Sequence, residues 1–138
     1  QIYIGTTVVD VMMNNNKELC GVVINSTPIT LTKMHVDPIC IASKIVLDAT
    51  GHPFEICSTV SKKVGKLNIP NTILGVISMK DWPAELAFVE NTKEIYPNRF
   101  VSGMAANGVF RSPRMGPIFG CMLLSGKLVA EKILEKLK

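Results

Sequence analysis

The sequence lacks three features that would each point directly to a class of protein. No apolar run approaches the ~18 residues that a membrane-spanning helix needs, and the four cysteines contain no Cys-x-x-Cys pair that would indicate a zinc site. Charged residues are only 19% of the 138 residues, against roughly 25% in ordinary soluble domains. With 47% hydrophobic residues, the composition excludes disorder, collagen-like repeats and a coiled coil. We expect one domain whose surplus apolar surface is covered by a subunit interface or by a further part of the same chain.

The charged residues are scattered, which limits the possible partners. There are 15 Lys and Arg and 11 Asp and Glu, for a formal net charge of +4. The cations are dispersed except for Lys62, Lys63 and the C-terminal lysines, so we expect no nucleic-acid partner. The sequence offers no membrane span either, and we expect a cytoplasmic protein.

The cysteines and the start of the sequence bear on its context. We interpret the cysteines as buried small hydrophobes in a reducing cytoplasm rather than as disulfides, with their individual roles open; they are Cys20, Cys40, Cys57 and Cys121. The sequence begins at Gln1 inside an alternating apolar run, with no methionine and no signal peptide. We therefore expect a piece of a longer chain.

Hydrophobic periodicity predicts an α/β order of elements. Residues 1–13 and 19–25 are rich in β-branched side chains and flank a polar turn, which predicts an antiparallel hairpin. Residues 44–50 are a short apolar run before a glycine, typical of a buried parallel strand. Residues 118–137 have the spacing of an amphipathic helix. We further expect an extended segment at 26–33, a helix at 53–63, strands at 85–89 and 99–104, and a small-residue turn at 105–108, with 65–79 unassigned.

Two histidines and a carboxylate form the first candidate group. His35 and Asp37 precede the predicted parallel strand, and His52 follows its end. These are the only histidines of the sequence, and both lie beside turn residues. Imidazole and carboxylate ligands together suit Fe(II), Mn(II) or Zn(II). A turn-capping aspartate with two hydrogen-bonded histidines explains the same residues, so the pattern alone leaves both interpretations open.

Two further groups could bind an anion and a cofactor. Residues 111–117 (RSPRMGP) place arginines just before the predicted last helix, whose free N–H groups favour a carboxylate or phosphate. A solvated arginine in a proline-rich connection is the alternative. Residues 48–51 (DATG) and 100–104 (FVSGM) end predicted strands, where doubly wound folds bind a dinucleotide. The GxGxxG phosphate motif is absent, so any dinucleotide site in this sequence is half a site.

The order and spacing of these groups resemble the thiamine thiazole synthases. The resemblance extends from Val8 to the C-terminal helix and corresponds to the C-terminal half of such an enzyme. It implies an α/β fold, the C-terminal half of a flavoprotein-like, Rossmann-type dinucleotide-binding fold with an antiparallel hairpin. Residues 1–138 would then be a single domain of a longer chain. The blocks that carry the resemblance are 34–38 (MHVDP), 45–52 (IVLDATGH), 89–97 (VENTKEIYP), 103–107 (GMAAN), 113–120 (PRMGPIFG) and 125–127 (SGK).

The resemblance also implies a reaction. Such enzymes are ring-like homo-octamers that convert NAD and glycine into the ADP-linked carboxythiazole precursor of thiamine. One branch takes the sulfur from its own cysteine in a single turnover. The other, an archaeal-type branch, has histidine at that position and uses free sulfide with Fe(II). His35 matches this histidine, so the sequence resembles the sulfide-using branch.

Matching positions imply the roles of individual residues. Asp37 and His52 resemble the iron ligands, with Asp37 donated across a subunit interface. Arg114, followed by Met115 and Gly116, resembles the residue that holds the glycine-derived carboxylate. The positions that resemble contacts to the NAD adduct are Val8, His35, Val36, Asp37 and Met104.

Two departures and two alternatives accompany this interpretation. Arg111 and Ser112 stand where the family usually has Gly-Ala, and Pro53 stands where it tends to have an acidic residue. The chain could instead be a truncated, inactive module for oligomer contacts, or a fragment of a generic FAD- or NAD-dependent oxidoreductase. The absence of a redox dithiol and the presence of the histidine–aspartate group argue against the second alternative.

Overall fold

The computed structural model describes residues 1–64 and 75–138, so most of the unassigned stretch lies outside the described residues. The predicted hairpin is confirmed: β1 (Thr6–Met13) pairs antiparallel with β2 (Leu19–Ser26), whose other edge pairs with β3 (Ile39–Ala42). In the turn, Asn14 Oδ1 accepts hydrogen bonds from the backbone N–H groups of Asn16 and Glu18, at 3.0 and 2.8 Å. The asparagine run therefore shapes the turn through its side chain.

The predicted parallel strand is also confirmed. β4 (Val46–Asp48) pairs parallel with β7 (Arg99–Val101), and β6 (Lys93–Tyr96) pairs antiparallel with β7. The expected helix at 53–63 is α2 (Glu55–Val64), which follows β4, while α4 (Met104–Val109) follows β7. The carboxyl ends of the two parallel strands therefore lead into the loops that carry the DATG and VSGM segments.

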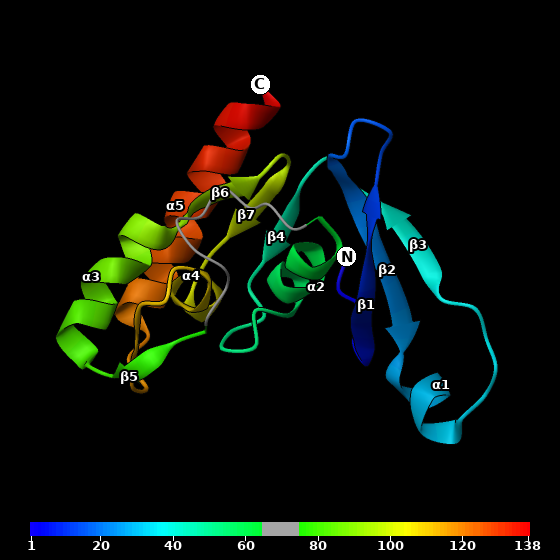
Figure 1. The fold of residues 1–138 in the computed structure, drawn as a ribbon, viewed down its shortest axis with the longest axis horizontal. Helices are drawn as coiled ribbons and strands as arrows, with labels where there is room; N and C mark the ends of the chain where they lie inside the picture. Colours follow the sequence, from blue (N-terminus) through cyan, green and yellow to red (C-terminus); the bar gives the residue numbers. More distant parts are fainter. Residues whose placement is uncertain (65–74) are drawn as a thin grey trace.

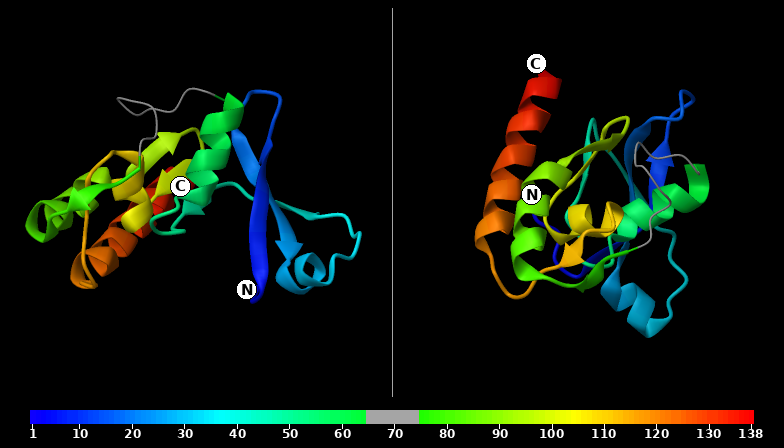
Figure 2. Two further views of the ribbon diagram at one scale, coloured as in Figure 1. Left: turned by 60° about the horizontal axis from the view of Figure 1, so that its bottom comes forward. Right: turned by 60° about the vertical axis from the view of Figure 1, so that its left-hand side comes forward.

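The third sheet is small and joins two long helices. β5 (Ile77–Met79) pairs parallel with β8 (Pro113–Arg114). α3 (Asp81–Asn91) follows β5, and α5 (Gly120–Leu137), which is the predicted last helix, follows β8. Figure 2 shows α3 and α5 packed side by side. This arrangement places β8 at the base of the helix pair.

Three sequence-based expectations are wrong. Residues 26–33 hold the short helix α1 (Thr27–Thr32) rather than an extended segment, because Pro28 lies in the first turn, where no N–H is needed. Residues 85–89 belong to α3, in which Ala84 and Phe88 are buried one helical turn apart. Residues 105–108 form the middle of α4 rather than a turn, and their small side chains are buried.

The described residues form three hydrophobic clusters, around which the elements are arranged. The first sheet and α1 lie at one end of the molecule, α3 and α5 lie at the other, and β4 and α2 lie between them (Figure 1). One cluster joins the first sheet to β4 and α2, a second joins β6, β7, α2 and α4, and a third joins α3 to α4 and to the start of α5. All four cysteines are free, as expected, but the expectation that they are buried holds only for Cys57: Cys40 is exposed, and Cys20 and Cys121 are half-buried. No helix in the described part of the chain is long and apolar enough to cross a membrane.

Candidate metal and carboxylate site

His52 lies in the loop between β4 and α2, and hydrogen bonds define the shape of this loop. Asp48 Oδ1 accepts hydrogen bonds from Thr50 N and Thr50 Oγ1, at 3.0 and 2.7 Å. Gly51 has φ +78°, in the left-handed region that glycine adopts without strain. The Gly51 carbonyl oxygen accepts a hydrogen bond from Phe54 N at 3.0 Å. These contacts form a tight turn that presents His52.

The His52 imidazole has the properties of a metal ligand. The residue is half-buried, and its buried Nδ1 atom has no hydrogen-bond partner within residues 1–64 and 75–138. Burial lowers the pKa of His52 below its ordinary value of 6.5, and the positive charge of Arg114 lowers it further. Both effects favour the neutral imidazole, which is the form that binds metal ions.

Arg114 is the last residue of β8, and its backbone is held on one side by β5. Its carbonyl oxygen accepts a hydrogen bond from Lys80 N at 3.1 Å, and Met79 is its partner in β5. The Arg114 side chain is exposed, yet its charge acts on His52. Two of the predicted site residues, from segments that are distant in the sequence, therefore interact electrostatically.

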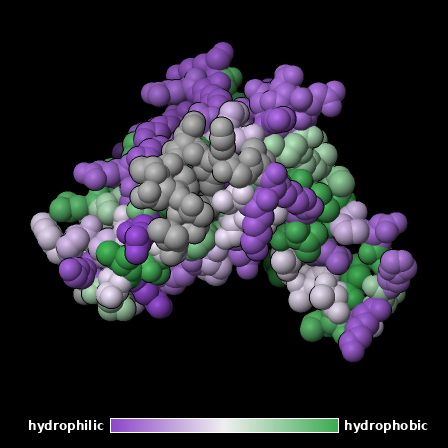
Figure 3. Space-filling view, viewed as in Figure 1, coloured by the Kyte–Doolittle hydropathy of each residue, from purple (hydrophilic) through white to green (hydrophobic). Residues whose placement is uncertain are grey.

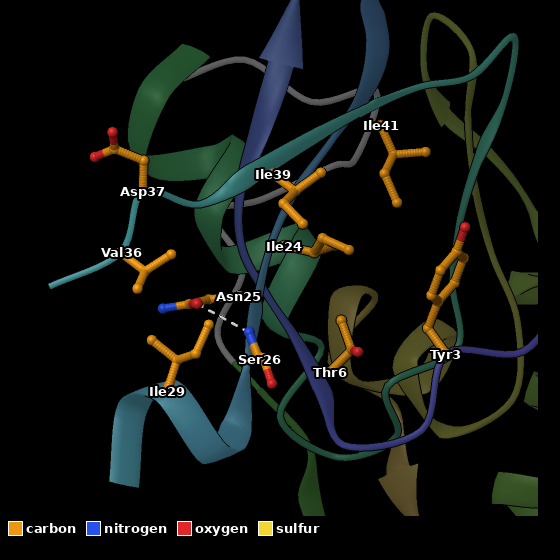
Figure 4. A pocket seen from close by; sticks show the side chains of 10 residues that line it. All are labelled: Tyr3, Thr6, Ile24, Asn25, Ser26, Ile29, Val36, Asp37, Ile39 and Ile41. Carbon is orange, nitrogen blue, oxygen red and sulfur yellow. Dashed lines mark hydrogen bonds between the residues drawn. The ribbon is translucent and has the colours of Figure 1, made fainter. Parts of the chain in front are cut away.

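His35, Val36 and Asp37 lie in the loop between α1 and β3, and all three are exposed. Val36 and Asp37 border an apolar pocket of about 320 Å³ over one face of the first sheet. In Figure 4 the Val36 side chain faces the pocket, whereas the Asp37 carboxylate points away from it. The carboxylate is therefore presented outward from the sheet. The other lining residues are Tyr3, Thr6, Ile24, Asn25, Ser26, Ile29, Ile39 and Ile41.

Within residues 1–64 and 75–138, the structure does not assemble a three-residue metal site in one chain. Among the described residues, no three His, Cys, Asp or Glu side chains lie close enough together to hold a metal ion. The loop between α1 and β3 lies at one end of the molecule, and the loop between β4 and α2 lies nearer its middle (Figure 1). The donation of Asp37 across a subunit interface stays a prediction.

The other predicted contact residues lie in the core or against it. Val8 is half-buried in β1 and packs against the first hydrophobic cluster. Met104 is 6% exposed and Met115 is 3% exposed, and both belong to the cluster that includes Phe88. Gly116 is half-buried. The burial of Met115 fixes the chain directly after Arg114, but the predicted roles of these residues toward NAD and glycine are not tested by this packing.

Sequence reasoning missed a buried ion pair beside the site. Arg99 Nη2 lies 3.7 Å from Asp48 Oδ2, and both side chains are fully buried. Burial lowers the pKa of Arg99 and raises the pKa of the neighbouring Cys57 thiol. The signal that could have revealed the pair is Arg99, a charge at the start of the otherwise apolar segment 99–101, together with Asp48 at the end of the predicted parallel strand.

These features define a class of protein. The chain is an α/β protein in which β4 and β7 run parallel, each followed by a helix, and in which His52 and Met104 follow the ends of these strands. Ligands of open α/β sheets commonly bind at such strand ends. Comparisons with known proteins agree with an α/β fold and identify a family within this class.

The Thi4 family model matches residues 1–119. The thiamine thiazole synthase of Methanococcoides burtonii is 50% identical over 140 residues, which cover 99% of this chain and 54% of that protein. The one from Methanothermobacter thermautotrophicus is 48% identical over 131 residues, which cover 94% of this chain and 50% of that protein. The crystal structure of Thermovibrio ammonificans THI4 matches with a TM-score of 0.88 and 45% identity, covering 96% of this chain and 52% of that one.

The chain belongs to the Thi4 family. The resemblance inferred from the sequence is confirmed, and the α/β fold matches that of a solved Thi4 structure. The chain spans about half the length of the relatives it matches.

Proposed function

We propose that the protein carrying this chain acts in thiamine thiazole biosynthesis and forms the ADP-linked carboxythiazole from NAD, glycine and free sulfide with Fe(II). The observation that carries the proposal is the buried His52 nitrogen that has no partner among the described residues, on an imidazole whose pKa is lowered by burial and by the charge of Arg114. A metal ligand beside a carboxylate-binding arginine is the combination that this reaction needs. The names of the relatives support the pathway.

The residues present fit Fe(II). His52 offers a nitrogen that has no partner among the described residues, and Asp37 offers an exposed carboxylate on a loop. Because no described chain segment completes the ligand set, we propose that Asp37 comes from a neighbouring copy in a homo-oligomer. The resemblance to the family implies that this oligomer is an octamer. Bound by two protein ligands, Fe(II) would keep open coordination positions for substrate and sulfide.

Arg114 and the loop at 35–37 would hold the organic substrates. A guanidinium can bind the glycine-derived carboxylate through two parallel hydrogen bonds. The NAD-derived part of the adduct would contact Val8, Val36, Asp37 and Met104. The rest of that part would bind to the GxGxxG unit of a longer, Rossmann-type fold. His35 would stand in place of a sulfur-donating cysteine, so that sulfur comes from free sulfide.

The exposed apolar surface supports a larger assembly. Figure 3 shows hydrophobic surface over the first sheet and α1 and, separately, near the base of α3. We propose that further parts of the protein or other copies cover these faces, since soluble monomers rarely expose large apolar patches. Exposed residues at the two ends include Ile2, Ile4, Leu31, Met34, Ile39, Ile77, Met79, Trp82 and Leu86.

The same exposed apolar surface also supports the alternative that the chain is a truncated, inactive module for oligomer contacts. Light scattering and an activity assay distinguish this alternative from the proposed enzyme. A concentration-independent monomer of residues 1–138 would contradict the assembly proposal. An assembly without thiazole formation in the full polypeptide would favour the module instead.

The test of function uses the full polypeptide that carries this sequence, assayed anaerobically with NAD, glycine, sulfide and Fe(II). Arg114→Ala should lose activity, because a carboxylate that is buried or half-buried in the complex and loses its arginine partner costs about 2–5 kcal/mol of binding. Arg114→Lys should also be poor, since an ammonium cannot form the bidentate pair. Arg111→Gly is the matched control and should retain activity. Equal activity of Arg114→Ala and the unsubstituted protein would remove Arg114 from the site.

The metal assignment has its own test. Asp37→Ala and His52→Ala should each lose bound Fe(II) after anaerobic reconstitution, whereas His35→Ala should retain the metal and impair the reaction. Stoichiometric iron in both ligand variants would show that the assignment is wrong.

A further inference from the structure

The buried carboxylate of Asp48 binds both sides of the loop that carries His52. On one side, Asp48 Oδ1 accepts the two hydrogen bonds from Thr50. On the other, Asp48 Oδ2 accepts a hydrogen bond from Cys57 N at 2.7 Å, in the first turns of α2. Thr50 Oγ1 extends the network, because it also accepts a hydrogen bond from Glu55 N at 2.9 Å. The hydrogen bonds of one carboxylate and one hydroxyl therefore span His52 from both directions.

Arg99 balances the charge of this carboxylate without occupying its oxygens. The separation of 3.7 Å between Arg99 Nη2 and Asp48 Oδ2 is longer than a hydrogen bond. None of the three guanidinium nitrogens has a hydrogen-bond partner among the described residues. A fully buried carboxylate needs both a counter-charge and hydrogen-bond donors. Here Arg99 supplies the charge, and the donors come from Thr50 and Cys57.

We propose that Asp48, acting through Thr50, is a positioning residue for His52. The carboxylate fixes the turn, and the turn fixes the direction in which the imidazole meets its metal ion. This inference rests on the proposed function, in which His52 holds Fe(II). Groups that orient a metal ligand typically change metal affinity by about 10–100-fold when they are removed.

Thr50→Val in the full polypeptide is the decisive variant. It keeps the shape of the side chain but removes both the donor to Asp48 and the acceptor for Glu55 N. Thr50 is exposed, so the fold should tolerate the change. We expect Fe(II) affinity, measured anaerobically against a chromogenic chelator, to fall about 10–100-fold. The visible absorption bands of bound Co(II) should also shift, because the imidazole is reoriented.

Two further variants separate positioning from general stability. Thr50→Ser keeps the hydroxyl and should restore both the Fe(II) affinity and the Co(II) spectrum. Thr59→Val is the matched control: Thr59 Oγ1 donates to the Glu55 carbonyl oxygen at 3.0 Å within α2, outside the His52 loop. It should leave metal binding unchanged. Asp48→Asn should show the largest loss, but it also leaves Arg99 without its counter-charge, so unfolding of this variant alone does not decide the question.

The outcomes distinguish this inference from the proposed function. If the unsubstituted protein binds Fe(II) and Thr50→Val binds it equally well with the same Co(II) spectrum, the Thr50 hydroxyl does not position His52 and the inference that Asp48 acts through it is wrong, while the proposed function stands. If the unsubstituted protein binds neither metal, the proposed function and this inference are both wrong.

Discussion

Asn107 Nδ2 donates a hydrogen bond to the carbonyl oxygen of Pro113 at 3.4 Å, one residue before Arg114. The same Nδ2 donates to the Ala84 carbonyl oxygen in α3 at 3.2 Å. Asn107 Oδ1 accepts a hydrogen bond from Asn91 Nδ2 at 3.1 Å. One fully buried side chain in α4 therefore ties α3 to the strand that ends in Arg114.

Replacing Asn107 should destabilise the protein strongly. Asn107→Ala leaves the carbonyl oxygens of Ala84 and Pro113 without this donor, and each buried polar group left unsatisfied costs roughly 1–3 kcal/mol. We expect a loss of at least about 2 kcal/mol in the free energy of unfolding, measured with urea. Asn15→Ala, at an exposed position of the hairpin turn, is the control and should stay within about 0.5 kcal/mol. Equal stability of the two variants would contradict the role of Asn107.

The electrostatic interaction between His52 and Arg114 predicts how the pKa of His52 changes when Arg114 is replaced. Because the positive charge of Arg114 lowers the pKa of His52, Arg114→Gln should raise that pKa toward 6.5, with burial still holding it below. NMR titration of the metal-free protein measures this directly. Arg111→Gln is the control, and it should leave the pKa of His52 unchanged. An unchanged value in Arg114→Gln would show that the two side chains do not interact in solution.

The lowered pKa of His52 also gives a sign for acid stability. The unfolded chain binds a proton to this imidazole near pH 6.5, whereas the folded chain does so only at lower pH. The contribution to stability is thus fully present above pH 6.5 and is lost as the pH falls through the folded value. In metal-free protein, His52→Gln should reduce the loss of stability between pH 6.5 and the folded pKa, as measured by thermal unfolding.

Local sequence signals predicted the parts of the fold that local chemistry controls. The hairpin follows from β-branched runs around an asparagine turn, and Asn14 itself bonds the turn. The parallel strand follows from its uninterrupted apolar run. By contrast, a window limited to residues 85–89 omits the start of this helix, where Asp81 and Pro83 lie in the first turn. The helix also depends on the burial of Ala84 and Phe88 in the third cluster. Such tertiary contacts are not visible in a short window of sequence.

The candidate site was predicted in its residue types but not in its geometry. Residue patterns supplied His52 and Arg114 as separate candidates and the resemblance to a family suggested their roles, while the interaction between them depends on the packing of sheets and helices. The pair Asp48–Arg99 was missed because its contact arises from the parallel pairing of β4 with β7, which joins residues 51 positions apart in the sequence. Burial then gives the pair its importance, since water no longer screens the two charges.

Gly108 in α4 should not tolerate a side chain. A Cβ atom at Gly108 would lie 2.4 Å from Cδ1 of the Phe54 ring. This ring atom is near the base of the Phe54 side chain, so it cannot move away freely. Gly108→Ala therefore forces the ring to move and should cost about 1–3 kcal/mol of stability. Gly126→Ala in α5 is the control: a Cβ atom there meets nothing within 4 Å, and alanine should stabilise the helix by about 0.5–1 kcal/mol.

A second-site variant checks the cause. If the ring is the obstacle, Gly108→Ala should cost much less in a Phe54→Ala background than in the unsubstituted protein. Equal costs in the two backgrounds would show that some other contact excludes the methyl group.

Arg111 adopts φ +54°, in the left-handed region where a non-glycine residue is strained by roughly 1–2 kcal/mol. In the sequence, Arg111 stands where the resembled family usually has glycine. The backbone conformation gives a physical reason for glycine at this position, because glycine adopts a positive φ without strain. Arg111→Gly relieves the strain but adds freedom to the unfolded chain, so we expect a net gain of about 1 kcal/mol or less. Arg111→Ala removes the same exposed side chain and keeps the strain, so it should bring no such gain. Thermal unfolding of the full polypeptide measures both variants. If alanine stabilises as much as glycine, the effect belongs to the arginine side chain rather than to its backbone conformation.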